Sequence, residues 1–131
     1  MIVDSSAVVG ILLREPGWEE LLDHIARADP APGIGAPTLA ETGIVLAARL
    51  GIPGKTLLAR FIQESGMRQV AFTMDHWTVA IDAFLRYGKG CHPAALNFGD
   101  CLTYATSRLA QEPLLCVGDD FSKTDLTLVV A

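Results

Sequence analysis

The sequence predicts an α/β fold built on a mostly parallel sheet. Short apolar runs alternate with longer segments that carry a helical pattern of apolar residues along almost the whole chain. Such alternation is typical of parallel strands joined by crossover helices. Half of the 131 residues are apolar and 19% are charged. This composition predicts one packed domain over residues 1–131 and argues against disorder.

The elements of the N-terminal half follow from apolar spacing and from residues that start or stop helices. Ser5 or Ser6 is expected to cap the first helix, which Pro16 and Gly17 end. Gly51 is expected to end a later helix, because glycine adopts the left-handed conformation that commonly closes helices. We expect strands at 1–3 and 34–36 and helices at 7–13, 18–28, 38–50 and 54–65.

The C-terminal half shows the same alternation. Thr73 and Asn97 are expected to cap its two helices, and Gly88 is expected to close the first of them. A polar turn over 119–123 should follow the strong apolar run at 114–117. We expect strands at 69–72, 114–117 and 126–130 and helices at 74–87 and 98–110.

Acidic residues stand where this fold would bring them together. Asp4 ends the first apolar run, and Asp119 and Asp120 follow the run at 114–117. Glu41 and Asp100 stand near the starts of two predicted helices. Because chemistry in open α/β sheets takes place outside the carboxyl ends of the strands, we expect these carboxylates to share one site.

Each acid also has a simpler explanation, and for Asp4 it is an ordinary turn or helix cap. Glu41 could close a capping box with Thr38, the predicted first residue of its helix. Asp100 stands three residues after Asn97, where the helix dipole favours a negative charge. The pair after the fourth strand could be an ordinary polar turn, and of the two Asp119 is favoured because it is nearer to the strand end.

Electrostatics favours the shared site. Two carboxylates about 5 Å apart repel each other by roughly 3 kcal/mol at an effective dielectric constant near 20. Four of them together require either a bound cation or raised pKa values. Mg²⁺, or Mn²⁺ in its place, prefers such oxygen ligands and can activate water for attack on phosphorus.

Charge and cysteine content limit the possible roles. The net charge is −5, so the whole surface does not attract polyanions, and contact with a phosphate requires local groups. The candidates for such contact are Ser5, Ser6, Arg14, Arg86, Lys89 and Lys123. Three unpaired cysteines and the lack of a signal peptide or an apolar run long enough to span a bilayer predict a cytoplasmic protein without membrane contact.

Several segments in order resemble the PIN-domain ribonucleases, and specifically the VapC toxins of toxin–antitoxin modules. The matching segments are 1–7 (MIVDSSA), 38–41 (TLAE), 96–101 (LNFGDC) and 118–125 (GDDFSKTD), with 86–90 (RYGKG) resembling a VapC subgroup. The resemblance implies a three-layer α/β/α sandwich, dependence on Mg²⁺ or Mn²⁺, and endonucleolytic cutting of RNA. It also implies a homodimer and a cognate VapB-type antitoxin.

The resemblance assigns roles to the acids as well. Asp4 and Asp100 are expected to ligate the metal directly, with Glu41 and one of Asp119 and Asp120 holding its waters or a second ion. Ser5 or Ser6 is expected to orient a metal-bound water.

Other functions remain open at this stage. A phosphatase of the haloacid dehalogenase type also begins with a strand-end aspartate, but it needs a second one at position 6, where this chain has Ser6. A receiver domain needs a lysine after a late strand, and none follows Val117 directly. A PIN-fold ribonuclease that processes RNA outside a toxin–antitoxin module, and a non-catalytic PIN module that binds RNA or a partner, are the remaining alternatives.

Overall fold

A four-stranded parallel sheet forms the centre of the computed structural model, which describes residues 1–129. The strands lie in the order β3-β2-β1-β4, and all three neighbouring pairs are parallel. They are β1 (Ile2–Val3), β2 (Gly33–Gly35), β3 (Arg68–Val70) and β4 (Leu114–Leu115). The helices are α1 (Ser5–Leu12), α2 (Trp18–Arg27), α3 (Ala36–Leu50), α4 (Ile52–Ser65), α5 (Met74–Tyr87) and α6 (Phe98–Ala110), followed by the short 3-10 helix η1 (Phe121–Lys123).

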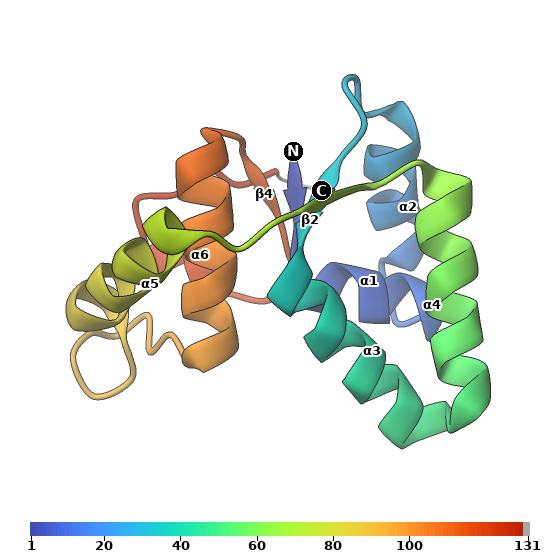
Figure 1. Cartoon of the computed structure of the whole chain (residues 1–131), viewed down its shortest axis with the longest axis horizontal. Helices are drawn as coiled ribbons and strands as arrows, with labels where there is room; N and C mark the ends of the chain where they lie inside the picture. Colours follow the sequence, from blue (N-terminus) through green and yellow to red (C-terminus); the bar gives the residue numbers. More distant parts are fainter. Residues whose placement is uncertain (130–131) are drawn as a thin grey trace.

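Helices cover both faces of the sheet, so the predicted three-layer α/β/α sandwich is confirmed. In Figure 1, α1 to α4 lie on one side of the strands and α5 and α6 on the other. Successive residues of a strand point to opposite faces, and β1 shows this directly. Val3 packs into the core beneath α1 to α4, whereas Ile2 packs into the core beneath α5 and α6.

The strand order reverses between β1 and β4. The chain passes from β1 to β2 and then β3 on one side, and it returns to place β4 on the other side of β1. The carboxyl ends of β1 and β4 lie level, because the backbone N–H of Asp4 donates to the carbonyl of Leu115 at 2.9 Å. Ligands of open α/β sheets bind at such a reversal of strand order.

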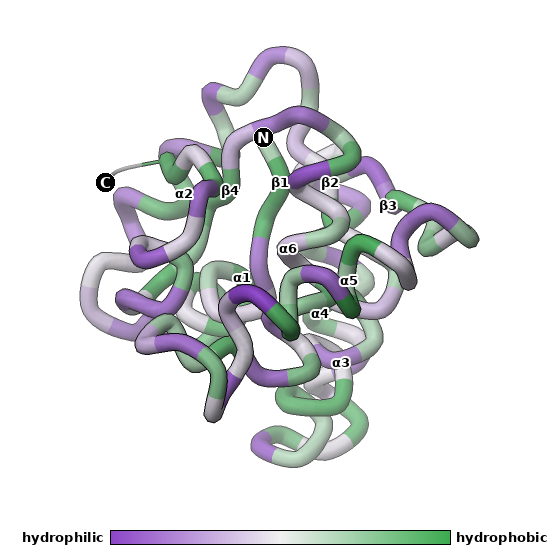
Figure 2. Tube along the Cα trace, turned by 90° about the vertical axis from the view of Figure 1, so that its left-hand side faces the viewer, coloured by the Kyte–Doolittle hydropathy of each residue, from purple (hydrophilic) through white to green (hydrophobic). Residues whose placement is uncertain are grey.

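Figure 2 shows the hydrophobic colour of β1 giving way to hydrophilic colour where the strand ends. That end is occupied by Asp4, which caps α1 by accepting from the backbone N–H of Ser6. The prediction that Ser5 or Ser6 is the cap was therefore wrong, and both residues lie inside the helix.

The start of α3 also differs from the prediction. The helix begins at Ala36 with Gly35 as its N-cap, so Thr38 is already in the first turn. Pro37 explains the early start, because its fixed φ suits the first turn of a helix and no hydrogen bond from its nitrogen is needed there. The helix start predicted at Thr38 was therefore wrong, and the alternative explanation of Glu41 as the capping-box partner of Thr38 does not apply.

The later strands are shorter than predicted. β4 ends at Leu115, because the backbone N–H of Val117 donates to the Ser6 hydroxyl at 3.0 Å instead of continuing the ladder. Of the strand predicted at 126–130, the structure has a single parallel bridge between Leu128 and Leu114, and Val130 lies outside the described residues. No helix within residues 1–129 combines the length and the apolarity needed to cross a membrane.

Candidate functional site

Asp4 is the buried member of the acidic group. It follows β1 directly and is only 5% exposed. Its Oδ2 accepts from the backbone N–H of Ser6 at 3.1 Å and from the Ser6 hydroxyl at 2.6 Å. Its Oδ1 accepts from the Thr103 hydroxyl at 2.9 Å. These donors hold the Asp4 side chain in one orientation at the end of the strand.

Asp100 lies in the first turn of α6 and takes part in a capping box. Its carboxylate accepts from the backbone N–H of Asn97 at 3.1 Å, and its own N–H donates to the Asn97 side chain at 2.9 Å. The prediction of Asn97 as the N-cap, with Asp100 three residues later, is therefore confirmed. The capping role does not exclude a second role, because one of its two carboxylate oxygens makes this bond.

The surroundings of Asp100 disfavour its charged form. Burial, the largest cause, raises the pKa of Asp100 from its ordinary value of 3.8 to about 6, against the hydrogen bond from the Asn97 backbone, which lowers it. The negative charges of Asp4, Asp120 and Glu41 raise this pKa further. Carboxylates from four separate segments therefore act on one another at this site, as the sequence predicts for a shared acidic centre.

Glu41 reaches the site from α3. It is half-buried, and its carboxylate contacts the backbone of Gly99, the residue before Asp100. A Cβ atom at position 99 would overlap this carboxylate, so the Glu41 side chain would have to move if residue 99 were not glycine. The starts of α3 and α6 are thereby brought together across the carboxyl edge of the sheet.

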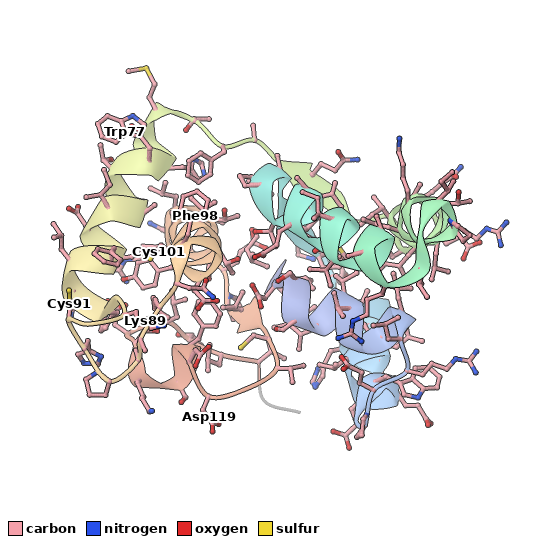
Figure 3. The ribbon with its side chains drawn as sticks, turned by 90° about the horizontal axis from the view of Figure 1, so that it is seen from below. Trp77, Lys89, Cys91, Phe98, Cys101 and Asp119 are labelled. Carbon is pink, nitrogen blue, oxygen red and sulfur yellow. The ribbon has the colours of Figure 1, made fainter. Side chains whose placement is uncertain are left out.

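The two neighbouring acids after β4 have different environments. Gly118 adopts a left-handed φ of 97° and turns the chain away from the strand. The labelled side chain of Asp119 then points outward at the edge of the molecule (Figure 3). The charge of Asp120 is among the main causes that raise the pKa of Asp100, and that of Asp119 is not. The structure thus groups Asp120, and not Asp119, with Asp4, Glu41 and Asp100.

The chemistry of the four side chains suits a hard divalent cation. All their potential ligand atoms are carboxylate oxygens, which Mg²⁺ and Mn²⁺ prefer over the nitrogen and sulfur ligands typical of zinc. Within residues 1–129, no three Asp, Glu, His or Cys side chains stand close enough to ligate a single ion in their present orientations. A cation would have to draw these mutually repelling carboxylates inward.

The predicted phosphate-binding residues differ in whether another side chain already binds them. Ser6 binds Asp4 directly, whereas Arg86 pairs with Asp125 at 3.4 Å and is already engaged. Lys89 and Lys123 are exposed, and neither takes part in an ion pair found within residues 1–129.

Arg14 and Ser5 do not join the acidic group either. The guanidinium of Arg14 stacks on the ring of Trp18 at 5.3 Å, beyond the far end of α1 from Asp4. Ser5 is half-buried beside Asp4, but none of the hydrogen bonds found within residues 1–129 joins its hydroxyl to that carboxylate.

Two residues at the site were not predicted from the sequence. Thr103 donates to Asp4, and its position three residues after Asp100 places it on the same face of α6, which is the signal that could have identified it. Cys116 is half-buried, packs against the core beneath α5 and α6, and lies beside the acids. Burial, followed by the charges of Asp4, Asp100 and Asp120, raises the pKa of its thiol to about 12, so this thiol stays neutral.

A broad apolar surface adjoins the acidic group. Phe98, at the start of α6, is 80% exposed, and Ile44 on α3 is 70% exposed. Figure 3 shows Phe98 between α5 and α3. A groove of about 570 Å³ lies between α3 and α6 and is lined by Ile44, Phe98 and Glu41 among others. A second groove, beside Phe98, is lined by Ile81 and Phe84 of α5. We call this surface the apolar face, and it comprises Ile44, Ile81, Phe84 and Phe98.

Comparison with known proteins agrees with the fold and the motifs. The family model of the PIN domain matches residues 1–126. Ribonuclease VapC36 of Mycobacterium tuberculosis is 48% identical over 126 residues, covering 96% of this chain and 91% of that protein. Ribonuclease VapC of Mycolicibacterium smegmatis is 39% identical over 129 residues, covering 98% and 99% of the two chains.

A solved structure gives the same result for the fold. The crystal structure of Mycobacterium tuberculosis VapC20, a sarcin–ricin loop cleaving toxin, superimposes with a TM-score of 0.80 at 19% identity, covering 99% of this chain and 98% of that chain. Together with the sequence matches, this similarity shows that the chain belongs to the PIN-domain family and, within it, to the VapC ribonucleases.

Proposed function

We propose that this chain is a divalent-metal-dependent endoribonuclease and the toxin of a VapBC-type toxin–antitoxin module. The observation that carries the proposal is the convergence of Asp4, Glu41, Asp100 and Asp120 near the carboxyl ends of β1 and β4. Their mutual repulsion contributes to the raised pKa of Asp100 and is relieved when a cation binds. The names of the 48% and 39% identical relatives support RNA as the substrate.

The proposed cation is Mg²⁺, with Mn²⁺ as a substitute. Asp4 and Asp100 are the proposed direct ligands, and Glu41 and Asp120 complete the oxygen set, with Asp120 in the place for which the sequence favoured Asp119. When bound, such a cation lowers the pKa of water and stabilises negative charge on the phosphate.

The chain's own residues prepare this site. Ser6 and Thr103 fix the Asp4 carboxylate, and the backbone of Asn97 fixes one oxygen of Asp100. Lys89 and Lys123, which are free of ion pairs within residues 1–129, are the proposed contacts for RNA phosphates flanking the cut. Arg86 is a weaker candidate because Asp125 already neutralises it.

The proposed partners are a cognate VapB-type antitoxin and a second copy of this chain. Solved structures of the same fold support the first partner, because one of them is VapBC2 of Rickettsia felis bound to a promoter DNA fragment, at a TM-score of 0.77 and 13% identity. The apolar face supports association in general, because exposed apolar patches of this kind usually mark interaction sites. The proposed location is the cytoplasm.

Cleavage of total bacterial RNA by the purified chain tests the proposal. We expect cutting with Mg²⁺ or Mn²⁺ and none with EDTA. Asp120→Asn should reduce cutting on the order of tenfold or more. Asp119→Asn, which changes the same charge one residue away, should leave it nearly normal.

Cutting that persists in EDTA would exclude a metal-dependent enzyme. Binding of RNA without any cutting would favour the non-catalytic PIN module instead. If Asp119→Asn is the impaired variant, the fourth acid is the one that the sequence favoured.

A further inference from the structure

A chain of buried hydroxyl groups ends on Asp4. The Thr103 hydroxyl donates to Asp4 Oδ1 at 2.9 Å and lies 3.1 Å from the Thr38 hydroxyl. Thr103 is 1% exposed and Thr38 is 3% exposed. The chain thus joins α3, α6 and the end of β1, which carry three of the four proposed metal ligands.

The direction of the hydrogen bonds follows from the number of protons. A threonine hydroxyl has one proton, and that of Thr103 is committed to the Asp4 carboxylate, which can only accept. Thr38 must therefore donate to Thr103. The two hydroxyl dipoles point the same way, toward Asp4 Oδ1, so each strengthens the other in this buried setting.

The donors divide unequally between the two oxygens of Asp4. Oδ2 accepts from both the backbone N–H and the hydroxyl of Ser6, which uses its two lone pairs. Oδ1 has Thr103 as its single donor within residues 1–129 and keeps one lone pair free. Oδ1 is therefore the oxygen with capacity for a cation, and Thr103 acts on that same atom.

Thr103 makes this bond although a local alternative exists. A buried threonine in a helix can satisfy its hydroxyl with the carbonyl four residues earlier. Thr106, on the same helix and 2% exposed, does this with Leu102 at 3.0 Å, and Thr42 does it with Thr38 at 2.7 Å. Thr103 instead reaches a residue 99 positions away in the sequence.

We propose that Thr103 is a positioning residue for the metal centre, which orients Asp4 so that Oδ1 presents its free lone pair to the cation, with Thr38 holding Thr103 in turn. This inference rests on the proposed function, because it concerns the ligand set of that site. Partners that orient a metal ligand in this way typically contribute about 10- to 100-fold to metal affinity or activity.

Binding of Mn²⁺ to the full chain without RNA tests the proposal, with isothermal titration calorimetry as the measurement. Thr103→Val keeps the shape and removes the donor, so we expect affinity for Mn²⁺ to fall about tenfold or more. Thr103→Ser restores the hydroxyl and should bind within about twofold of the original chain. Thr38→Val removes only the outer donor and should give a smaller loss.

Thr106→Val is the matched control. It removes a buried hydroxyl from the same helix, so its cost in folding stability should resemble that of Thr103→Val, but it should leave Mn²⁺ affinity unchanged. Melting temperatures of all variants, measured in EDTA, separate folding from binding. If Thr103→Val does not fold, Thr103→Ser and Thr38→Val still decide the matter.

The outcomes of these experiments test the positioning role of Thr103 separately from the proposed nuclease function. Unchanged Mn²⁺ affinity in Thr103→Val or Thr38→Val, or an equal loss in Thr106→Val, overturns the positioning role and leaves the metal-dependent nuclease standing. Failure of the unchanged chain to bind Mn²⁺ overturns both.

Discussion

Replacing Asp100 by asparagine should stabilise the protein when no metal is present. Burial, and after it the charges of Asp4, Asp120 and Glu41, raises the pKa of the Asp100 carboxyl group to about 6. Ionised Asp100 is therefore held in an unfavourable environment at neutral pH. Asparagine keeps an oxygen that can accept from the Asn97 backbone but removes the charge.

The size of the effect follows from the pKa. A rise of this pKa from 3.8 to about 6 corresponds to a loss of about 3 kcal/mol in the free energy of unfolding when Asp100 is ionised. Because Asp100 is only partly buried, solvent screening reduces this to about 1–2 kcal/mol. Loss of a negative charge at the start of α6 costs about 0.3–1 kcal/mol. The net gain should raise the melting temperature by a few degrees, roughly 2–6 °C.

The pH dependence has a definite sign. The pKa of Asp100 is raised in the folded state, so ionisation of this carboxyl group lowers the free energy of unfolding as pH rises from about 4 through about 6. The advantage of Asp100→Asn should be complete at pH 7.5 and nearly gone at pH 4. Saturating Mg²⁺ should reverse it at pH 7.5, because the cation stabilises only the chain that binds it.

Urea denaturation in EDTA, followed by circular dichroism at both pH values, measures this effect. Asp75→Asn is the control, because Asp75 also lies in the first turn of a helix but is exposed and outside the acidic group. It should be neutral or slightly destabilising. An Asp100→Asn variant that is no more stable than the original chain at pH 7.5, or whose gain persists at pH 4, would refute the reasoning.

Three substitutions test close packing at and behind the site. Gly99→Ala should lower Mn²⁺ binding and RNA cutting, because the new methyl group displaces the Glu41 side chain. Helix propensity favours alanine over glycine by up to about 1 kcal/mol, so the fold itself should not be destabilised. Normal cutting with an unchanged melting temperature would contradict the contact between Glu41 and Gly99. Gly54→Ala places a Cβ 2.5 Å from the carbonyl oxygen of Leu46 and should cost about 1–3 kcal/mol in urea denaturation; a neutral result would show that α3 and α4 can separate freely. Leu46→Ala, at a fully buried position, should cost about 2–5 kcal/mol by the same measurement, and a loss under 1 kcal/mol would mean that the core refills the space.

Local signals in the sequence were sufficient for most helix ends. Asn97 and Thr73 cap the helices for which they were predicted, and Gly51 and Gly88 end theirs, because each acts through bonds or dihedral angles within a few residues. Position 37 shows the limit of such signals. The preference of Pro37 for a first turn competed with the capping pattern that begins at Thr38, and the earlier start prevailed.

Contacts across long stretches of chain were not predictable in the same way. The pairing of Thr103 with Asp4 depends on how far α6 lies from the end of β1, which only packing decides. The difference between Asp119 and Asp120 depends on the left-handed turn at Gly118, since the two side chains are chemically identical. The acids as a group were predictable because parallel strands bring their carboxyl ends to one edge.

The apolar face has a consequence for handling the free protein. Side chains such as Phe98 and Ile44 stay in contact with water unless something covers them, and water disfavours that contact. The isolated chain should therefore aggregate more as its concentration increases, and sulfate salts should promote this aggregation. Purification in low salt together with a partner that covers these side chains should yield more soluble protein than purification of the chain alone.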